Sequence, residues 1–360
     1  MTGRLGTDSG RAPRASARRG KRALVLALLA AGLAAAVLLA VGAGAVRVPL
    51  GSLLRLAAYH LGFREVGLPP PQEATILLLI RLPRVLAALL VGAGLAAGGV
   101  VMQGLFRNPM ASPDILGVST GGGLGAVTAI ATGLAGSSPL FLPALAVAGA
   151  LAAAFLIYAI SSYRGKTSLL FVVLAGLAIS SFFNGLVSAI LLFARQYEVS
   201  QFIFWTMGGF EGRTWRHVLL ALPVLVPGLA AMGLFARPLN LLALGEEGAQ
   251  SLGLSVEAAK RILLAVTAVV AGVAISISGP VGFVGLLIPH LFRLLLGPDH
   301  RVLLPASILG GALFLILCDL AGRALVPPFE IRVGIITAVL GSPYFLFLIL
   351  RAQRRRLQLG

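Results

Sequence analysis

The sequence has few of the residue types that carry most enzyme chemistry. Its 360 residues include 12 Asp and Glu, four His and one Cys. The lone Cys318 excludes an intrachain disulfide and a metal cluster held by several cysteines. No two of the histidines stand four residues apart or in an HExxH motif, which excludes a zinc protease of that type. The four are His60, His217, His290 and His300.

Nucleotide-binding motifs are also missing. Residues 165–167 (Gly-Lys-Thr) resemble the end of a phosphate-binding loop, but the position that this loop requires to be its first glycine is Ile160. The glycines of residues 121–126 imitate a dinucleotide fingerprint, yet they lie in an apolar run with no strand before them. We therefore expect a chain that is not an enzyme and that binds neither a cofactor nor a metal of its own.

Charge is scarce and mostly of one sign. Charged residues make up 11% of the chain and hydrophobic residues 58%. At about 20 apolar residues per membrane-spanning helix, this content suffices for roughly ten crossings and predicts an all-α polytopic membrane protein. Lys and Arg outnumber Asp and Glu by 29 to 12. The basic residues lie in short stretches between apolar runs rather than on a face with aromatic readers, so nucleic acid is not an expected partner.

Ten apolar runs are predicted to span the lipid bilayer. They lie near residues 23–46, 84–105, 115–134, 140–162, 168–193, 217–236, 261–279, 281–297, 303–323 and 333–350. Turn residues set two of the boundaries, at 137–139 (Ser-Ser-Pro) and 278–280 (Ser-Gly-Pro). A secretory signal is the alternative for the first run, but 24 uncharged residues are too many for one. The expected organisation is a disordered basic tail at 1–22, a membrane domain at 23–350 and a basic C-terminus at 351–360.

The distribution of basic residues predicts the orientation. With the N-terminus inside, ten crossings return the C-terminus to the same side and place 19 of the 29 Lys and Arg residues inside, as the positive-inside rule requires. We expect a multi-pass protein of a bacterial cytoplasmic membrane with both termini in the cytoplasm. Within the spans, Gly94 and Gly98, and likewise Gly117, Gly121 and Gly125, have the spacing of close helix packing.

The longest polar stretch inside the membrane domain runs from residue 239 to 261. It predicts two short amphipathic helices on the cytoplasmic side, separated near Gly253, with Ser255 as an N-cap and Glu257 in the first turn. Apolar residues stand beside acidic ones, which suits docking into the groove of a partner. These residues are Leu242, Leu244, Leu252 and Leu254, with Glu246 and Glu247.

Charged residues also stand out at the predicted outer surface. Arg81 and Arg84 are expected to face outward together and to pair with carboxylates of a docking protein, with anchoring at the membrane interface as the alternative. Asp319 and Arg323 stand four apart near the outer end of the ninth span and predict an ion pair. Gln103, polar within a span, is a candidate for the translocation pathway or for a hydrogen bond between helices.

The order and spacing of several motifs resemble the permeases of type II ABC importers for ferric siderophores, haem and cobalamin. The motifs are IRLPR (80–84), QxxxRNPMASPDILGVSTGG (103–122), WTMGGF (205–210), LGEEGAQSLGL (244–254), GFVGLLIPHLFRLLLGPDHR (282–301), the pair at 319 and 323, and VGIITAVLGSPYFLFL (333–348). The resemblance covers roughly residues 23–350 and leaves out the basic tail.

This resemblance implies partners and functional residues. It implies ten helices per subunit, a homodimer or pseudo-dimer, two cytoplasmic ATPases that bind ATP and Mg²⁺, and an extracytoplasmic binding protein. Residues 239–261 resemble the coupling helices that enter the ATPase groove. The coupling residues are Leu242, Leu244, Gly245, Glu246, Glu247, Gln250, Leu252 and Gly253. Arg81, Arg84 and Arg323 resemble arginines that meet carboxylates of the binding protein. Thr167 and Ser168 correspond to the cytoplasmic gate, and Gln103, Asn108 and Pro109 are further candidates for the pathway and gate.

The expected cargo is a metal chelate that the importer moves into the cytoplasm. A ferric siderophore is favoured, haem comes next, and cobalamin is the alternative. From another class of protein, the alternative is a secondary transporter that works without ATP. Such a transporter needs a carboxylate or histidine at mid-membrane for ion coupling, and the candidates are Asp319 and His290, of which Asp319 falls near the end of a span.

Overall fold

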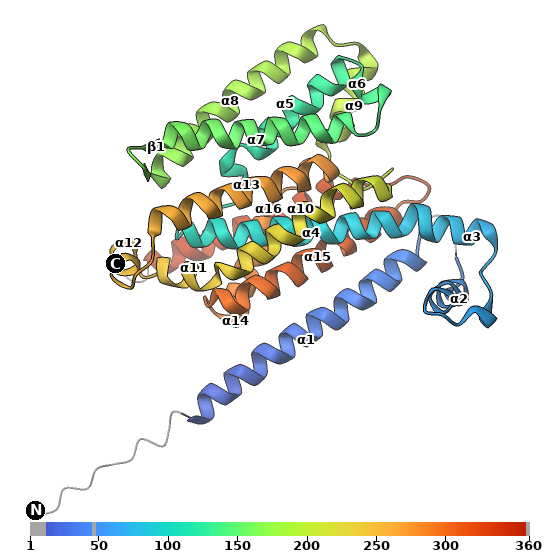
Figure 1. The fold of residues 1–360 in the computed structure, drawn as a ribbon, viewed down its shortest axis with the longest axis horizontal. Helices are drawn as coiled ribbons and strands as arrows, with labels where there is room; N and C mark the ends of the chain where they lie inside the picture. Colours follow the sequence, from blue (N-terminus) through green and yellow to red (C-terminus); the bar gives the residue numbers. More distant parts are fainter. Residues whose placement is uncertain (1–11, 45–47, 358–360) are drawn as a thin grey trace, which may run out of the picture.

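Each of the ten apolar runs forms a helix (Figure 1). The structure is a computed structural model and describes residues 12–44 and 48–357. The ten helices are α1 (Ala12–Gly42), α4 (Leu82–Leu105), α5 (Val118–Ala131), α7 (Phe141–Ser161), α8 (Leu169–Phe193), α10 (Trp215–Leu234), α13 (Val256–Ser278), α14 (Val284–Leu296), α15 (His300–Ala324) and α16 (Val333–Leu357). Among the described residues, seven helical stretches are long and apolar enough to cross a membrane, and α5, α14 and α16 add shorter apolar segments.

Shorter elements connect these helices, and apart from the segment near residue 250 the sequence does not predict them. They are α2 (Leu50–His60), η1 (Arg64–Val66), α3 (Pro71–Thr75), η2 (Ile76–Arg81), η3 (Pro113–Leu116), α6 (Leu134–Ser137), α9 (Gln196–Thr206), α11 (Ala236–Leu242) and α12 (Glu246–Ser251). Strands β1 (Ser162–Tyr163) and β2 (Lys166–Thr167) form an antiparallel hairpin with Ser162 opposite Thr167. Arg164 and Gly165 turn this hairpin, and both have positive φ, as a type I′ turn requires.

Two of the predicted boundaries are wrong. α1 begins at Ala12, so residues 12–22 are helical instead of disordered, while residues 1–11 lie outside the described part of the chain. The second span begins well before residue 84, because α3, η2 and α4 form one helical stretch from Pro71 to Leu105. The wide π turn of η2 accommodates Pro83, which has no N–H to bond to the preceding turn. The two breaks predicted from turn residues are confirmed after α6 and after α13.

The helices form two groups (Figure 1). Helices α5, α7, α8 and α9 lie together in one group, and α4, α10, α14 and α15 belong to the other. α4 is buried along most of its length against α10, α13, α14 and α15, so it is the central helix. α13 contacts both α4 and α7 and therefore joins the two groups.

Glycine allows the closest contacts between these helices. A Cβ added at Gly99 would lie 1.8 Å from a backbone oxygen of α14, and one added at Gly125 would lie 1.9 Å from a backbone oxygen of α7. Larger side chains could not fit, so backbones approach directly, as is typical of helices in lipid. The predicted packing role of Gly121 and Gly125 is confirmed, whereas Gly94 and Gly98 contact side chains at ordinary or slightly short distances.

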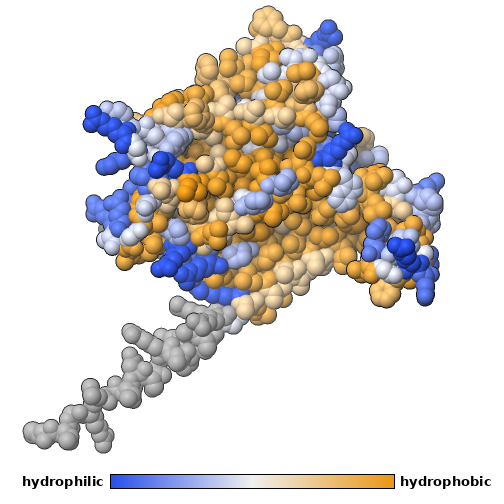
Figure 2. All heavy atoms as spheres, viewed as in Figure 1, coloured by the Kyte–Doolittle hydropathy of each residue, from blue (hydrophilic) through white to orange (hydrophobic). Residues whose placement is uncertain are grey.

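The molecule has two polar ends with an apolar middle. We call the end with the β1–β2 hairpin, α11 and α12 the hairpin end, and the opposite end, with α2, α3 and α6, the far end (Figure 1). Figure 2 shows hydrophobic residues over the middle and hydrophilic residues gathered toward both ends. This distribution is the one expected for helices that cross a bilayer.

Candidate functional site

The predicted coupling segment forms two short helices at the hairpin end. The predicted break near Gly253 is present and separates α12 from α13, but α13 is a long helix. A second break, which was not predicted, separates α11 from α12 at Gly245, whose φ of 104° suits glycine. Ser255 occupies the N-cap position of α13 and Glu257 lies in its first turn, as predicted, although the Ser255 side chain makes no capping bond.

The side chains of this segment divide into an anchored and an exposed set. Leu242 and Ala249 are buried, and they fix α11 and α12 to the rest of the molecule. Leu244 is 66% exposed and Leu252 is 60% exposed. Large apolar side chains held at a polar end, with a buried anchor behind them, form a surface suited to a partner protein. Glu247, Gln250 and Gly253 lie on the same short stretch.

Lys260 connects the coupling segment to the β1–β2 hairpin. Its ammonium Nζ lies 2.8 Å from Glu246 Oε1 of α12 and 3.2 Å from Glu257 Oε1 of α13. It also donates a hydrogen bond of 3.3 Å to the backbone oxygen of Thr167. Glu257 in turn accepts a 2.8 Å bond from the Thr167 backbone N–H. The Lys260 side chain is almost completely buried, so the two carboxylates and the Thr167 oxygen provide the contacts that water would otherwise make to its ammonium group.

The hairpin connects this network of hydrogen bonds and ion pairs to the start of α8. Thr167 is buried, and its hydroxyl lies 3.1 Å from that of Ser162 across the strand pair. Ser168 follows as the N-cap residue of α8, and its N–H bonds to the oxygen of Ser161 at 3.1 Å. The two predicted gate residues therefore lie between the coupling segment and a long helix. The sequence analysis did not connect them, because Lys260 is 93 positions from Thr167.

A second connection attaches α11 to α15 and α1. Asn240 donates to Asp299 Oδ1 at 2.9 Å and accepts from the backbone N–H and ring Nδ1 of His300 at 2.9 and 2.8 Å. Asp299 caps α15 through the N–H of Arg301 and pairs with Arg22 of α1 at 3.4 Å. Burial favours a higher pKa for Asp299, but the bonds from Asn240 and Arg301 and the charge of Arg22 outweigh it and lower the pKa.

The other predicted pathway residues lie on the neighbouring face of the hairpin end. Gln103 is buried and donates to the Leu286 oxygen of α14 at 3.1 Å, so it bonds two helices together. Asn108 and Pro109 are exposed in the turn after α4, where Asn108 Oδ1 accepts from the Met110 N–H at 2.9 Å. Arg107 in this turn lines one depression with residues 244–248 of the coupling segment.

At the far end, the arginines assigned to docking point inward. Arg81 is 4% exposed, so the prediction that it faces outward with Arg84 is wrong. Arg81 and Arg323 donate to backbone oxygens at the C-terminus of α1, residues 40–43. Those carbonyls have no partner within the helix, so the two guanidinium groups cap it. The sequence could not show this contact because α1 ends about 40 residues before Arg81.

Arg84 completes the far-end network. Its Nη2 lies 2.9 Å from Asp319 Oδ1 and 2.8 Å from Glu330 Oε2. The predicted Asp319–Arg323 pair is present, with 3.1 Å between Oδ2 and Nε. Asp319, which is 1% exposed, therefore neutralises two buried guanidinium groups across α4 and α15.

A further charged cluster at the far end was not predicted. Glu211 pairs with Arg332 at 3.0 Å, and the Arg332 guanidinium lies over the Phe204 ring. Arg213 lines the same surface depression as Glu211 and Arg332. Its burial there and the nearby charge of Arg332 lower its pKa to about 10. The available signal was the charged run that follows WTMGGF in the sequence.

Comparison with known proteins places this geometry in context. The model of the FecCD transport family matches residues 31–351. The cobalamin import system permease protein BtuC of Halobacterium salinarum is 45% identical over 78% of this chain and 74% of its own length. The hemin transport system permease protein HmuU of Yersinia pestis is 41% identical over 85% of this chain and 93% of its own. A solved structure described as an inward-facing conformation of a metal-chelate type ABC transporter matches 91% of this chain and 99% of its own, with a TM-score of 0.79 and 31% identity.

Proposed function

The chain belongs to the FecCD transport family, and from that membership we propose which cargo it carries and how it couples transport to ATP. It is a multi-pass membrane protein with the fold of an ABC importer permease, and it is a transport subunit and not an enzyme. Hydrolysis of ATP with Mg²⁺ takes place on a separate ATPase, and an extracytoplasmic binding protein delivers the cargo at the far end.

The proposed cargo is cobalamin or haem. The observation that carries this choice is that permeases named for cobalamin and for hemin share 45% and 41% identity with this chain over most of its length. A ferric siderophore, which the sequence analysis favoured, becomes the alternative. The specificity test is uptake of the three labelled chelates in cells with and without this gene.

The coupling mechanism follows from the buried network of Lys260. We place the exposed Leu244 and Leu252 in the groove of the ATPase, since large apolar side chains anchor such contacts. Movement of α12 would then pass through Glu246 and Lys260 to Thr167, because these groups are held by charge-assisted bonds of 2.8 to 3.3 Å. α8 begins at the next residues, so the hairpin would move with the ATPase as one rigid element.

Transport by purified protein tests this mechanism. In liposomes that contain the permease, its ATPase and the binding protein, Lys260→Gln and Glu246→Gln should reduce cargo uptake per ATP hydrolysed. The control is Arg301→Gln, because Arg301 is an exposed charge outside the coupling segment that makes no ion pair among the described residues. An equal loss of uptake per ATP in all three variants would show that coupling depends on the net charge of this end and not on these contacts. Unchanged uptake per ATP in Lys260→Gln would exclude coupling through Lys260.

A second copy of the chain is the proposed partner within the membrane. α8 exposes the amide of Asn184 inside an apolar span. Ser188, one turn later, is also exposed, and its hydroxyl donates to the Asn184 backbone oxygen at 2.9 Å. Polar groups that face lipid at this depth are costly, so a facing protein surface or a water-filled pathway should cover them. A homodimer formed along α8 supplies both, and the cargo would pass between the two copies.

The proposed orientation puts the hairpin end in the cytoplasm. This end carries the coupling segment, and the basic residues Arg164, Lys166, Arg237, Lys260 and Arg261 belong to it. Positive charge is enriched on the cytoplasmic side of membrane proteins. Both termini would then be cytoplasmic, in the cytoplasmic membrane of a bacterium.

A further inference from the structure

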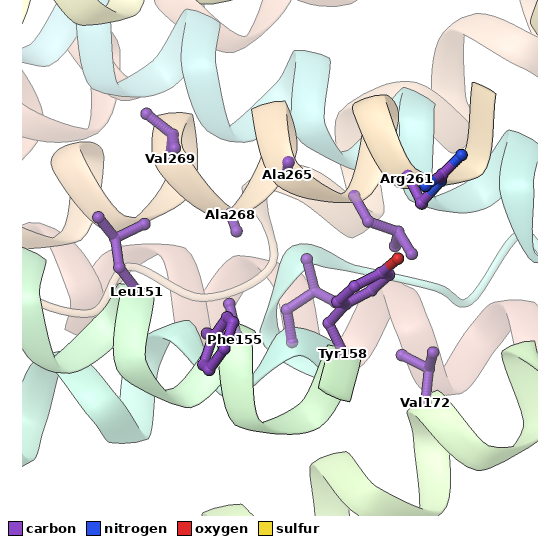
Figure 3. Close-up of a pocket in the computed structure, with 11 residues that line it drawn as sticks. Leu151, Phe155, Tyr158, Val172, Arg261, Ala265, Ala268 and Val269 are labelled. Carbon is purple, nitrogen blue, oxygen red and sulfur yellow. The ribbon is translucent and has the colours of Figure 1, made fainter. Parts of the chain in front are cut away.

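A groove opens on the side of the molecule between the two helix groups (Figure 3). α7, α8, α13 and η3 line a cavity of about 350 Å³ whose walls are almost entirely apolar. Phe155 in its wall is 68% exposed, and Ala265 and Val269 are also exposed. The groove is therefore open on the side that faces the bilayer, and it is not an internal packing defect.

One end of the groove is polar and carries a positive charge. Arg261 and Tyr158 lie together at this end, away from Leu151 and Val269 at the other (Figure 3). Arg261 is in the second turn of α13, and Tyr158 is three residues before the end of α7, so both lie toward the hairpin end. Arg261 is exposed and makes no ion pair with any residue in the described ranges.

The dimensions suit a single hydrocarbon chain. Tyr158 and Leu151 are seven positions apart on α7, and Arg261 and Val269 are eight apart on α13, which corresponds to about 11 Å along the helix axes. The apolar part of the groove therefore starts at the membrane interface, beside Arg261, and runs toward the bilayer centre. Arg164 and Lys166 of the hairpin, which contacts α13, add positive charge at the same end.

We propose that this groove binds one acyl chain of an anionic phospholipid whose phosphate pairs with Arg261. Charge complementarity carries the choice of occupant. An unpaired guanidinium at the membrane interface attracts anionic headgroups, and an open apolar slot directly beneath it holds the chain that such a headgroup carries. A helix of a second copy would cover the apolar walls but would leave the Arg261 charge unpaired.

The lipid would join the two helix groups. α7 and α8 form one wall of the groove and α13 forms the other, so an acyl chain between them contacts both groups at once. α13 also continues directly from the coupling segment. Occupancy of the groove should therefore resist separation of α13 from α7, whichever chelate the protein transports.

Native mass spectrometry of the full-length protein in detergent tests the proposal. Phosphatidylglycerol and phosphatidylcholine with identical acyl chains are added as probes. The wild type should retain phosphatidylglycerol about fivefold better, the preference expected from one interfacial arginine. Arg261→Gln should remove that preference, and Arg237→Gln, which removes an exposed arginine of α11 outside the groove, should keep it.

A second variant tests the cavity independently of charge. Ala265→Phe fills the groove from an exposed position of α13, so the protein should fold normally and lose retention of both lipids. Equal retention of the two lipids by the wild type would overturn the anionic site. Unchanged headgroup preference in Arg261→Gln, or unchanged retention in Ala265→Phe, would place any bound lipid elsewhere. None of these outcomes depends on transport, so they are separate from the test of the proposed function.

Discussion

At the scale of single residues, Asp319 has the greatest influence on the far end. It is 1% exposed and contacts both Arg84 and Arg323, which also holds the end of α1. Asp319→Asn would leave the buried Arg323 guanidinium without a carboxylate and Arg84 with Glu330 alone, so we expect a loss of about 3–5 kcal/mol in the free energy of unfolding. Thermal unfolding in detergent measures this loss.

Glu330 is the matched control for Asp319. It contacts the same Arg84, but a third of its side chain is exposed, so water can replace it. Glu330→Gln should cost less than about 1 kcal/mol. Equal destabilisation by the two variants would contradict the network described here.

Contacts within one helix could be predicted from the sequence, whereas contacts between distant elements could not. The Asp319–Arg323 pair could be predicted because both residues lie on one helix, four positions apart. The inward position of Arg81 could not, because its partners are carbonyls of a helix that only tertiary packing brings close. The role of Lys260 was missed for the same reason, since two of its three contacts, Glu246 and Thr167, lie in other elements.

At the scale of elements, the coupling segment should respond to a local break. Leu252→Pro disrupts the end of α12 at an exposed position, so the membrane helices should remain folded. We expect ATP-driven uptake to fall by at least about tenfold, as for an anchor residue of an interface. Leu61→Pro at the far end, also beyond the end of a short helix and exposed, is the control. Normal uptake by Leu252→Pro would exclude this segment from coupling.

The crossing of α4 and α14 depends on one glycine. Gly99→Ala would place a methyl group 1.8 Å from a backbone oxygen of α14, so the helices must separate. We expect a loss of about 1–3 kcal/mol, typical of overpacking, in thermal unfolding measurements. Gly233→Ala, in a helical position with open space around it, should be neutral or slightly stabilising. If both variants have the same stability, the close contact does not hold the helices together.

The elements that the sequence predicted are those with long apolar runs. Ten such runs gave ten helices, because a helix satisfies its backbone hydrogen bonds within its own segment when no water is present. The short helix α9 was not predicted, since its 11 residues of mixed polarity have no clear helical period. The start of the second span was misplaced because the arginines at 81 and 84 indicated the outer mouth of the span, whereas the helix continues back to Pro71.

At the scale of the whole molecule, the exposed polar groups of α8 predict a dimer. Asn184→Cys in a Cys318→Ser background leaves one cysteine per chain, at the proposed interface. Oxidation in membranes should yield a product of twice the chain mass, because the two copies of α8 would face each other. Ile160→Cys, on the exposed side of α7, should stay monomeric under the same conditions. If the Asn184→Cys variant stays monomeric on oxidation, as the Ile160→Cys variant does, this interface would be contradicted.

The central claim is that this chain is the permease of an ATP-driven importer of cobalamin or haem. The most direct measurement is uptake of labelled cobalamin, haem and a ferric siderophore in cells with the gene, without it, and without it but carrying a plasmid copy, each with and without ATP depletion. We expect energy-dependent uptake of cobalamin or of haem to be lost on deletion of the gene and restored by the plasmid. Loss of siderophore uptake alone, or uptake that survives ATP depletion, would contradict it.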